Sequence, residues 1–109
     1  MKKATGLIDA ETLDSIDPVI HAPARLAIMA LLRVVKKADF TFLYTQTGLT
    51  RGNLSSHLTK LEKSDFVEIE KLFEGKQPKT YVSLTKTGKK ALDDYWKHMQ
   101  PLLKLIGEN

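Results

Sequence analysis

The stretch that decides the fold is TGLTRGNLSSHLTKLEK, residues 47–63. Gly48 is suited to end one short helix, because a left-handed residue after the last turn is most often glycine. Thr50 follows two residues later and is suited to cap the start of another helix. Leu49 lies inside the turn between them. Two helices joined by a tight glycine turn that contains a hydrophobic residue are typical of a helix-turn-helix.

The second of these helices has two chemically different faces. At roughly 100° per residue, Leu54, Leu58 and Leu61 fall within about 60° of arc, which predicts a buried stripe. The opposite face carries Gly52, Ser56, Thr59, Lys60 and Lys63, with Asn53 and Ser55 on its flanks and Arg51 and His57 at its boundaries. This outward face has no acid and no large apolar side chain. Hydroxyl and amide groups bond phosphates or base edges and lysines neutralise phosphates, so the face suits DNA. The alternative is a surface helix with an accidental glycine.

Upstream, the sequence predicts a central helix and two smaller elements. The stretch PARLAIMALLRVVKK from Pro23 is apolar on almost every side, which is typical of the central helix of a small domain. Asp17-Pro18 predicts a short helix through His21, and residues 1–12 are expected to be loosely ordered. Phe40 to Phe42 alternate in character and predict an extended piece before a short helix over residues 43–47.

Downstream, the pattern changes from helical to strand-like and back. FVEIE, residues 66–70, and TYVSL, residues 80–84, alternate as strands do and enclose a basic, turn-rich stretch, which predicts a β-hairpin. Thr85 is suited to cap a final helix. Pro101 is expected to kink that helix or split it near Gln100.

Composition and charge narrow the class of protein. The 109 residues fit one domain with a modest core. There is no cysteine, which excludes disulfides and thiolate chemistry, and no apolar run reaches the roughly 18–20 residues of a membrane span. Residues 36–90 carry eleven basic and six acidic side chains, so the net charge of +4 arises entirely in the middle of the chain. A cytoplasmic protein with a polyanionic partner is expected, although solubility alone also accounts for the charge.

Three stretches together resemble a known family. HAPARLAIMALL (21–32), TGLTRGNLSSHLTKLEKSDFVEIEK (47–71) and YVSLTKTGKKAL (81–92) follow one another at the spacing found in winged helix-turn-helix regulators of the MarR-like and ArsR-like class. The resemblance covers about residues 17–100. It implies an α+β, mostly α fold, with a two-stranded β wing and an added C-terminal dimerisation helix. Residues 1–16 would form an arm that contributes to a dimer, 17–90 the DNA-binding domain and 91–109 the dimerisation helix.

The resemblance also implies a function. The chain would be a transcriptional regulator that binds double-stranded DNA sequence-specifically as a homodimer. A repressor is expected rather than an activator. Helix 50–64 would enter the major groove, and wing 72–80 would lie on the backbone or in the minor groove. The expected DNA-binding residues are Thr50, Arg51, Asn53, Ser55, Ser56, His57, Lys60, Lys76 and Lys79.

The C-terminal helix carries an apolar stripe that a small domain would not cover by itself. The expected dimer-interface residues are Leu92, Tyr95, Trp96, Met99 and Leu103, with Leu7, Ile8, Leu13 and Ile16 at the other end of the chain in similar need of cover. A two-fold dimer would bury both ends, whereas the alternative is that they fold back on one monomer. A small-molecule effector beneath Tyr95 and Trp96 stays open.

Two other functional classes agree less well with the sequence. An enzyme is disfavoured, because His21, His57 and His98 are scattered and no catalytic or phosphate-binding motif is present. Asp94 and His98 lie four apart on one helix, but two ligands do not make a metal site, so no metal or cofactor is expected. A winged-helix module that binds only proteins is the rival. The basic, acid-free outward face argues against it, since protein-binding faces more often carry aromatic residues.

Overall fold

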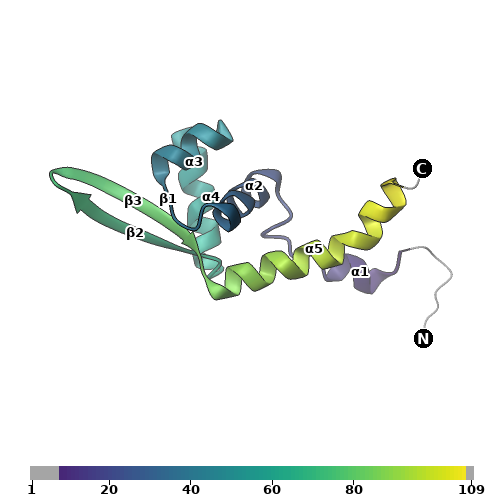
Figure 1. Cartoon of the computed structure of the whole chain (residues 1–109). Coiled ribbons are helices and arrows are strands. Elements are labelled where there is room, and N and C mark those ends of the chain that lie inside the picture. The colour runs from purple at the N-terminus through teal and green to yellow at the C-terminus, as the bar shows by residue number, and fades with distance from the viewer. Residues whose placement is uncertain (1–7, 108–109) are drawn as a thin grey trace.

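The computed structural model describes residues 8–107 of the chain. Its elements are α1 (Ala10–Asp14), α2 (Pro23–Val34), β1 (Ala38–Asp39), α3 (Phe40–Thr47), α4 (Arg51–Lys63), β2 (Val67–Glu74), β3 (Gln77–Leu84) and α5 (Lys86–Gly107). The three strands form one antiparallel sheet in the order β1-β3-β2. The β2–β3 hairpin projects from one side of the helices, and the far end of α5 projects from the other (Figure 1). The helix-turn-helix, the wing and the added C-terminal helix that the sequence predicts are all present.

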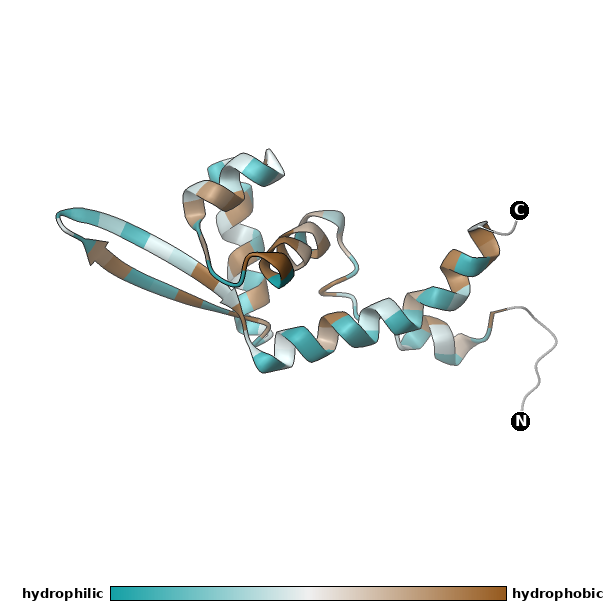
Figure 2. Cartoon of the chain, viewed as in Figure 1, coloured by the Kyte–Doolittle hydropathy of each residue, from teal (hydrophilic) through white to brown (hydrophobic). Residues whose placement is uncertain are grey.

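The core lies where α2, α3 and α4 meet the base of the sheet. Leu54, Leu58 and Leu61 of α4 are all buried, which confirms the predicted stripe. They pack in one cluster with Ile28, Met29 and Leu32 of α2, the helix whose ribbon is most uniformly hydrophobic in Figure 2. Burial of a leucine side chain stabilises a fold by roughly 1.5–3 kcal/mol, so this stripe is sufficient to fix the rotation of α4 about its axis.

The turn between α3 and α4 has the predicted geometry. Gly48 adopts φ 70°, and its N–H donates to the Tyr44 carbonyl at 3.2 Å. A side chain at this position would be strained, because positive φ disfavours residues with a Cβ. The Thr50 hydroxyl then accepts from the Asn53 N–H at 3.1 Å and caps α4.

The N-terminal prediction was wrong in two respects. A helix, α1, forms over Ala10–Asp14, and its cap is Asp9, whose carboxylate accepts from the Thr12 N–H at 2.8 Å. The residues after Asp17 form turns and no helix, because the Asp17 carboxylate bonds the Val19 N–H at 2.8 Å. Leu7 lies outside the described residues.

The start of α3 is also earlier than predicted. Only Ala38 and Asp39 are extended, and Phe40 and Phe42 lie in the helix. The reason is that Asp39 acts as a cap, its carboxylate accepting from the Phe42 N–H at 2.7 Å. The phenylalanine alternation was therefore a feature of a helix start and not of a strand.

The wing is longer than the predicted strands, and its turn is shorter than the predicted loop. Pairing continues from Val67 opposite Leu84 to Glu74 opposite Gln77. Only Gly75 and Lys76 remain between the strands, with Gly75 at φ 66°. A glycine at positive φ suits a two-residue hairpin turn, so a tight turn replaces the expected basic loop.

Helix α5 is neither split nor ended by Pro101. It runs without interruption from Lys86 to Gly107, although its last part turns away from the direction of its first (Figure 1). In residues 8–107 no helix is both long and apolar enough to cross a lipid bilayer.

The first turn of α5 is bonded to the start of the wing. The Thr85 hydroxyl donates to the Asp65 carbonyl at 2.6 Å and accepts from the Gly88 N–H at 2.8 Å, which confirms Thr85 as a helix cap. Gly88 is buried, and a Cβ built on it would lie 2.0 Å from the Phe66 carbonyl oxygen. Gly88 is therefore required by close packing, beyond being merely tolerated in the helix.

This contact predicts opposite outcomes for two helical glycines. Gly88→Ala would force α5 away from Phe66 and should lower the free energy of unfolding by about 3 kcal/mol. Gly52→Ala is the matched control, because a Cβ there meets nothing within 4 Å. It should raise the free energy of unfolding by about 1 kcal/mol through helix propensity alone. Urea unfolding followed by circular dichroism measures both, and equal effects of the two substitutions would contradict the packing argument.

Candidate nucleic-acid interface

The outward face of α4 is exposed along its whole length. Thr50, Arg51, Gly52, Asn53, Ser55, Ser56, Thr59, Lys60 and Lys63 are all exposed. One acid joins them, since Glu62 is exposed at the edge nearest the wing, where it lines a groove with Ser55 and Thr59. Glu62 corrects the expectation that the outward face carries no acid. The centre of the face and its first turn are free of acid.

The two boundary residues of this face are each held by another helix. The guanidinium of Arg51 lies over the ring of Tyr44 from α3, 4.4 Å from the ring centroid. On the other boundary, His57 is only partly exposed, and its Nδ1 lies 3.3 Å from Arg25 Nη1 of α2. Arg25 is fixed in turn, because its Nε donates to the Val19 carbonyl at 2.5 Å.

The contact with Arg25 determines what His57 can offer. A guanidinium has donors only, so His57 Nδ1 must accept from it. In a neutral imidazole the other nitrogen, Nε2, then carries the proton and is a donor. His57 is therefore oriented as a hydrogen-bond donor beside the outward face, which suits a phosphate oxygen.

The strand register separates charges between the two faces of the wing. Alternation along β2 and its pairing with β3 place Glu68, Glu70 and Glu74 on one face with Tyr81. Lys71, Phe73 and Thr80 belong to the other face, which continues from the core residues at the base of the wing. The face that leads out from α4 therefore carries a lysine and no acid.

The acidic face of the wing is occupied by its own contacts. The Tyr81 hydroxyl donates to Glu74 Oε2 at 2.6 Å, and this hydrogen bond raises the pKa of Tyr81 above its usual value. Lys37 Nζ lies 3.0 Å from Glu70 Oε1 and 5.1 Å from the centroid of the Tyr81 ring. Glu74 near the tip is thus bonded to a tyrosine on the same face, which weakens its repulsion of a phosphate.

A groove separates α4 from the wing. Its polar lining comes from Ser55, Thr59 and Glu62 of α4 and from Lys71 and Thr80 of the wing. Ser55, Thr59 and Thr80 present hydroxyl donors, and Lys71 adds a positive charge. Lys71 and Thr80 are not among the residues predicted from the sequence. Extending the strand alternation of FVEIE by two residues would have found Lys71.

The predicted wing lysines have different positions. Lys76 is exposed in the turn, whereas Lys79 is partly buried in β3 opposite Leu72, on the same face as the acids. The structure therefore brings Ser55 and Thr59 together with Lys71, and it does not place Lys79 on the face that leads out from α4.

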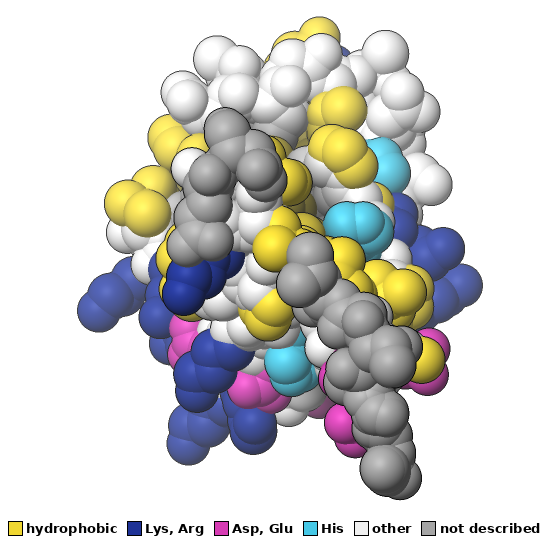
Figure 3. All heavy atoms as spheres, turned by 90° about the vertical axis from the view of Figure 1, so that its right-hand side faces the viewer, with side chains coloured by type: hydrophobic (Ala, Val, Ile, Leu, Met, Phe, Trp, Pro, Cys, Tyr) yellow, Lys and Arg dark blue, Asp and Glu magenta, His cyan; other side chains and the backbone are white. Residues whose placement is uncertain are grey.

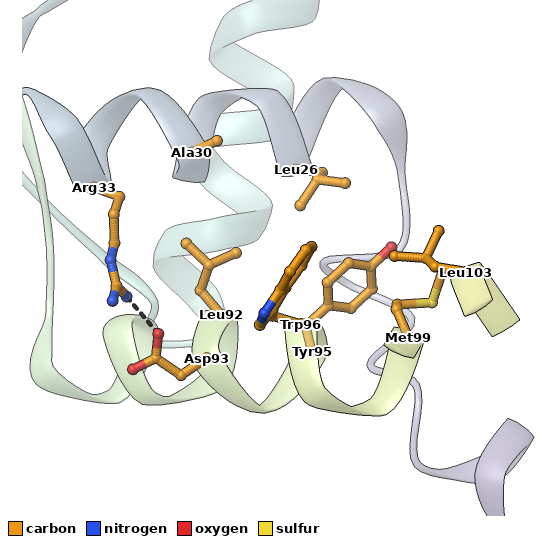
Figure 4. Close-up of a pocket in the computed structure, with 9 residues that line it drawn as sticks. All are labelled: Leu26, Ala30, Arg33, Leu92, Asp93, Tyr95, Trp96, Met99 and Leu103. Carbon is orange, nitrogen blue, oxygen red and sulfur yellow. Dashed lines mark ion pairs between the residues drawn. The ribbon is translucent and has the colours of Figure 1, made fainter. Parts of the chain in front are cut away.

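The predicted dimer residues lie along one side of α5. Figure 4 shows Leu92, Tyr95, Trp96, Met99 and Leu103 directed toward a groove beneath α2. An ion pair of 2.6 Å between Arg33 and Asp93 closes one end of this groove. Tyr95 is buried within the single chain, where its hydroxyl is hydrogen-bonded to His21 Nδ1 at 2.9 Å and burial raises its pKa. Trp96 is 63% exposed.

A winged helix DNA-binding domain model matches residues 24–103 of the chain. The chain belongs to this family. An uncharacterised protein of Methanocaldococcus jannaschii is 34% identical over 88 residues, which span 81% of this chain and 96% of that protein. The transcriptional regulator homologue of Pyrococcus horikoshii has a similar solved structure, with a TM-score of 0.81 and 28% identity over 88% of this chain and 97% of that one.

The winged-helix fold is also that of MarR. A mutant of Escherichia coli MarR in complex with operator DNA superposes with a TM-score of 0.66 and 17% identity, over 81% of this chain and 62% of that one. At this identity the likeness shows the fold alone. Family and fold are those of DNA-binding transcription regulators and not of enzymes.

The groove beside α4 gives this winged-helix protein a measurable property. For a duplex, log K falls as log salt rises, and Lys71→Gln should make that slope shallower by about 0.9, the value of one lost phosphate contact. Lys97→Gln removes the same charge from an exposed site on α5 and should leave the slope unchanged. Fluorescence anisotropy of a labelled duplex across a salt series measures both. Equal slopes for the two variants would exclude Lys71 from the interface.

Proposed function

We propose that this protein is a homodimeric regulator that recognises an inverted-repeat operator and acts as a repressor by occupying it. The proposal rests on one observation above all: α4 exposes a polar and basic face, and the acid-free face of the wing leads away from it across a groove that Lys71 lines. A DNA strand needs such a surface, with donors for the groove edge on one side and cations for the backbone on the other.

Each predicted residue has a role in this proposal. The major groove would be contacted by Arg51, Asn53, Ser56 and Lys60. Phosphates would be contacted by Ser55, by His57 and by the start of α4 at its cap, Thr50. A helix N-terminus favours an adjacent phosphate because its N–H groups and dipole point toward it. Lys76 in the wing turn would follow the adjacent minor groove or its backbone, and Lys71 joins it as a phosphate contact. Lys79 would contribute only its long-range charge.

The domain assignment is part of the same proposal. Residues 17–90 would bind DNA, 91–109 would carry the dimer helix, and 1–16 would add an arm to it. Figure 3 supports this division, because hydrophobic side chains gather on the end of the molecule that carries α1 and the last turns of α5. Leu13 of α1 and Leu103 and Ile106 of α5 are exposed, as is Trp96 midway along α5.

A second copy of the chain is the proposed cover for that end. The groove beneath α2 is lined almost entirely by apolar side chains, and two of these, Trp96 and Leu103, are exposed. Two-fold pairing would bury these residues and set two α4 helices toward two half-sites. A small-molecule effector would compete for the same groove.

A selection from random-sequence duplexes tests the function. The proposed function predicts that an inverted repeat is enriched, with half-sites about one helical turn apart, or about 10 base pairs centre to centre. Binding to the winner should weaken steeply as salt rises. No enrichment together with weak binding at physiological salt would refute DNA reading and favour the rival, a winged-helix module that binds only proteins.

A substitution pair tests the dimer. Leu103→Glu places a charge in the proposed apolar interface and should convert the protein to monomers at micromolar concentration, with loss of binding to the full inverted repeat. Phe73→Glu is the control for oligomeric state, because it places the same charge on an exposed hydrophobic side chain of the wing, outside the proposed dimer interface. Analytical ultracentrifugation measures whether each variant is a monomer or a dimer. A Leu103→Glu variant that sediments like the wild type would contradict the proposed interface.

A further inference from the structure

Arg51 differs from the predicted lysine contacts in that its charged group lies against an aromatic ring of another helix. The guanidinium carbon lies 4.4 Å from the centroid of the Tyr44 ring, and Tyr44 is itself partly buried in α3. In the part of the chain that the structure describes, no carboxylate is ion-paired with Arg51. The side chain is thus held by an aromatic face and not by an acid.

This difference matters for what the guanidinium can still do. A ring offers no acceptor oxygen, so the five N–H donors of the guanidinium stay available. A carboxylate partner would occupy those donors. Stacking also restricts the rotamers of a long side chain in the free protein, so less conformational entropy is lost when the donors engage a ligand.

The position of the stack agrees with a role in reading bases. Arg51 is the first residue of α4, directly after the Thr50 cap, and it is exposed at the boundary of the outward face. The first turn of a recognition helix is the part that contacts base edges in helix-turn-helix complexes. A planar fork of donors at that position matches the O6 and N7 acceptors of guanine better than any other base edge.

We propose that Tyr44 is a positioning residue that holds the Arg51 fork for the major-groove edge of a guanine, one in each half-site. This assignment rests on the proposed function, since it requires that α4 enters the major groove. Arg51 reads the base, and Tyr44 acts only through Arg51. The competing role for the stack is a brace that joins α3 to α4 and has no part in base selection.

The test uses the operator selected by the wild type and a set of duplexes in which each base pair is changed one at a time. Binding of the wild type, Tyr44→Leu, Tyr44→Phe and Arg51→Lys is measured by competition at fixed salt. The wild type should disfavour replacement of one G·C pair per half-site by about 5- to 150-fold, the range of a bidentate contact. Tyr44→Leu should reduce that discrimination by about 2- to 5-fold, the size of an exposed cation–π contact, and leave the other positions unchanged.

The other two variants separate the parts of the stack. Tyr44→Phe keeps the ring and should keep the discrimination, because the hydroxyl is not required. Arg51→Lys keeps the charge but has no planar fork, so it should lose most of the discrimination at that pair and retain affinity for non-specific duplex. Arg51→Lys alters only an exposed side chain, so it stays informative if Tyr44→Leu lowers the thermal unfolding midpoint too far for binding assays.

The results distinguish three cases. Loss of discrimination confined to one G·C pair in Tyr44→Leu and Arg51→Lys supports the assignment. Two results would overturn the assignment alone and leave the stack as a structural brace. In one, Arg51→Lys discriminates at every base pair as the wild type does. In the other, Tyr44→Leu binds every duplex more weakly by the same factor. A wild type that selects no operator overturns the proposed function, and with it the assignment.

Discussion

Burial of the leucine stripe of α4 is the constraint on which the rest of the interface depends. Leu54, Leu58 and Leu61 enter the core from one side of the helix, so every residue opposite them must face outward. Their combined burial outweighs the roughly 1 kcal/mol that Gly52 costs in helix propensity. The helix can therefore carry a poor helix former on its outward face, where the absence of a side chain leaves space for an approaching backbone. Stability and recognition are separated between the two sides of one helix.

The second constraint is the close approach of α5 to the base of the wing. With Gly88 against the Phe66 carbonyl and Thr85 bonded to Asp65, the hairpin and the long helix leave the core from one rigid joint. Asp65 adopts φ 63°, an unusual conformation for a non-glycine residue, two residues before β2 begins. The direction of the wing and that of the apolar end of α5 are consequently set by the same few residues. In a dimer built on α5, this joint would set the position of each wing relative to the partner.

The sequence predicted the elements whose signals are local, and it failed where a side chain competes with the backbone. The turn at Gly48, the cap at Thr50 and the stripe of α4 follow from periodicity and turn chemistry. Asp17 and Asp39 are one residue type in similar positions, yet Asp17 caps a turn and Asp39 caps a helix. Which of the two occurs depends on packing beyond the local sequence. Helix α5 continues through Pro101 and its last part turns away, which agrees with the kink and not with the split that the sequence also allowed, since a helix can accommodate proline by bending.

For the interface, the sequence indicated which residues face outward but not how they are held. Neither Arg51–Tyr44 nor Arg25–His57 follows from spacing, because each joins α4 to a different helix. The two contacts stand at opposite boundaries of the outward face, whereas Ser56 and Lys60 between them lie exposed on α4 with no such partner helix among residues 8–107. An oriented group loses little entropy on binding and can discriminate between positions of its ligand, while a mobile lysine follows a phosphate wherever it lies. The arrangement therefore favours selectivity at the edges of the recognition helix and adaptable, sequence-independent attachment along its centre.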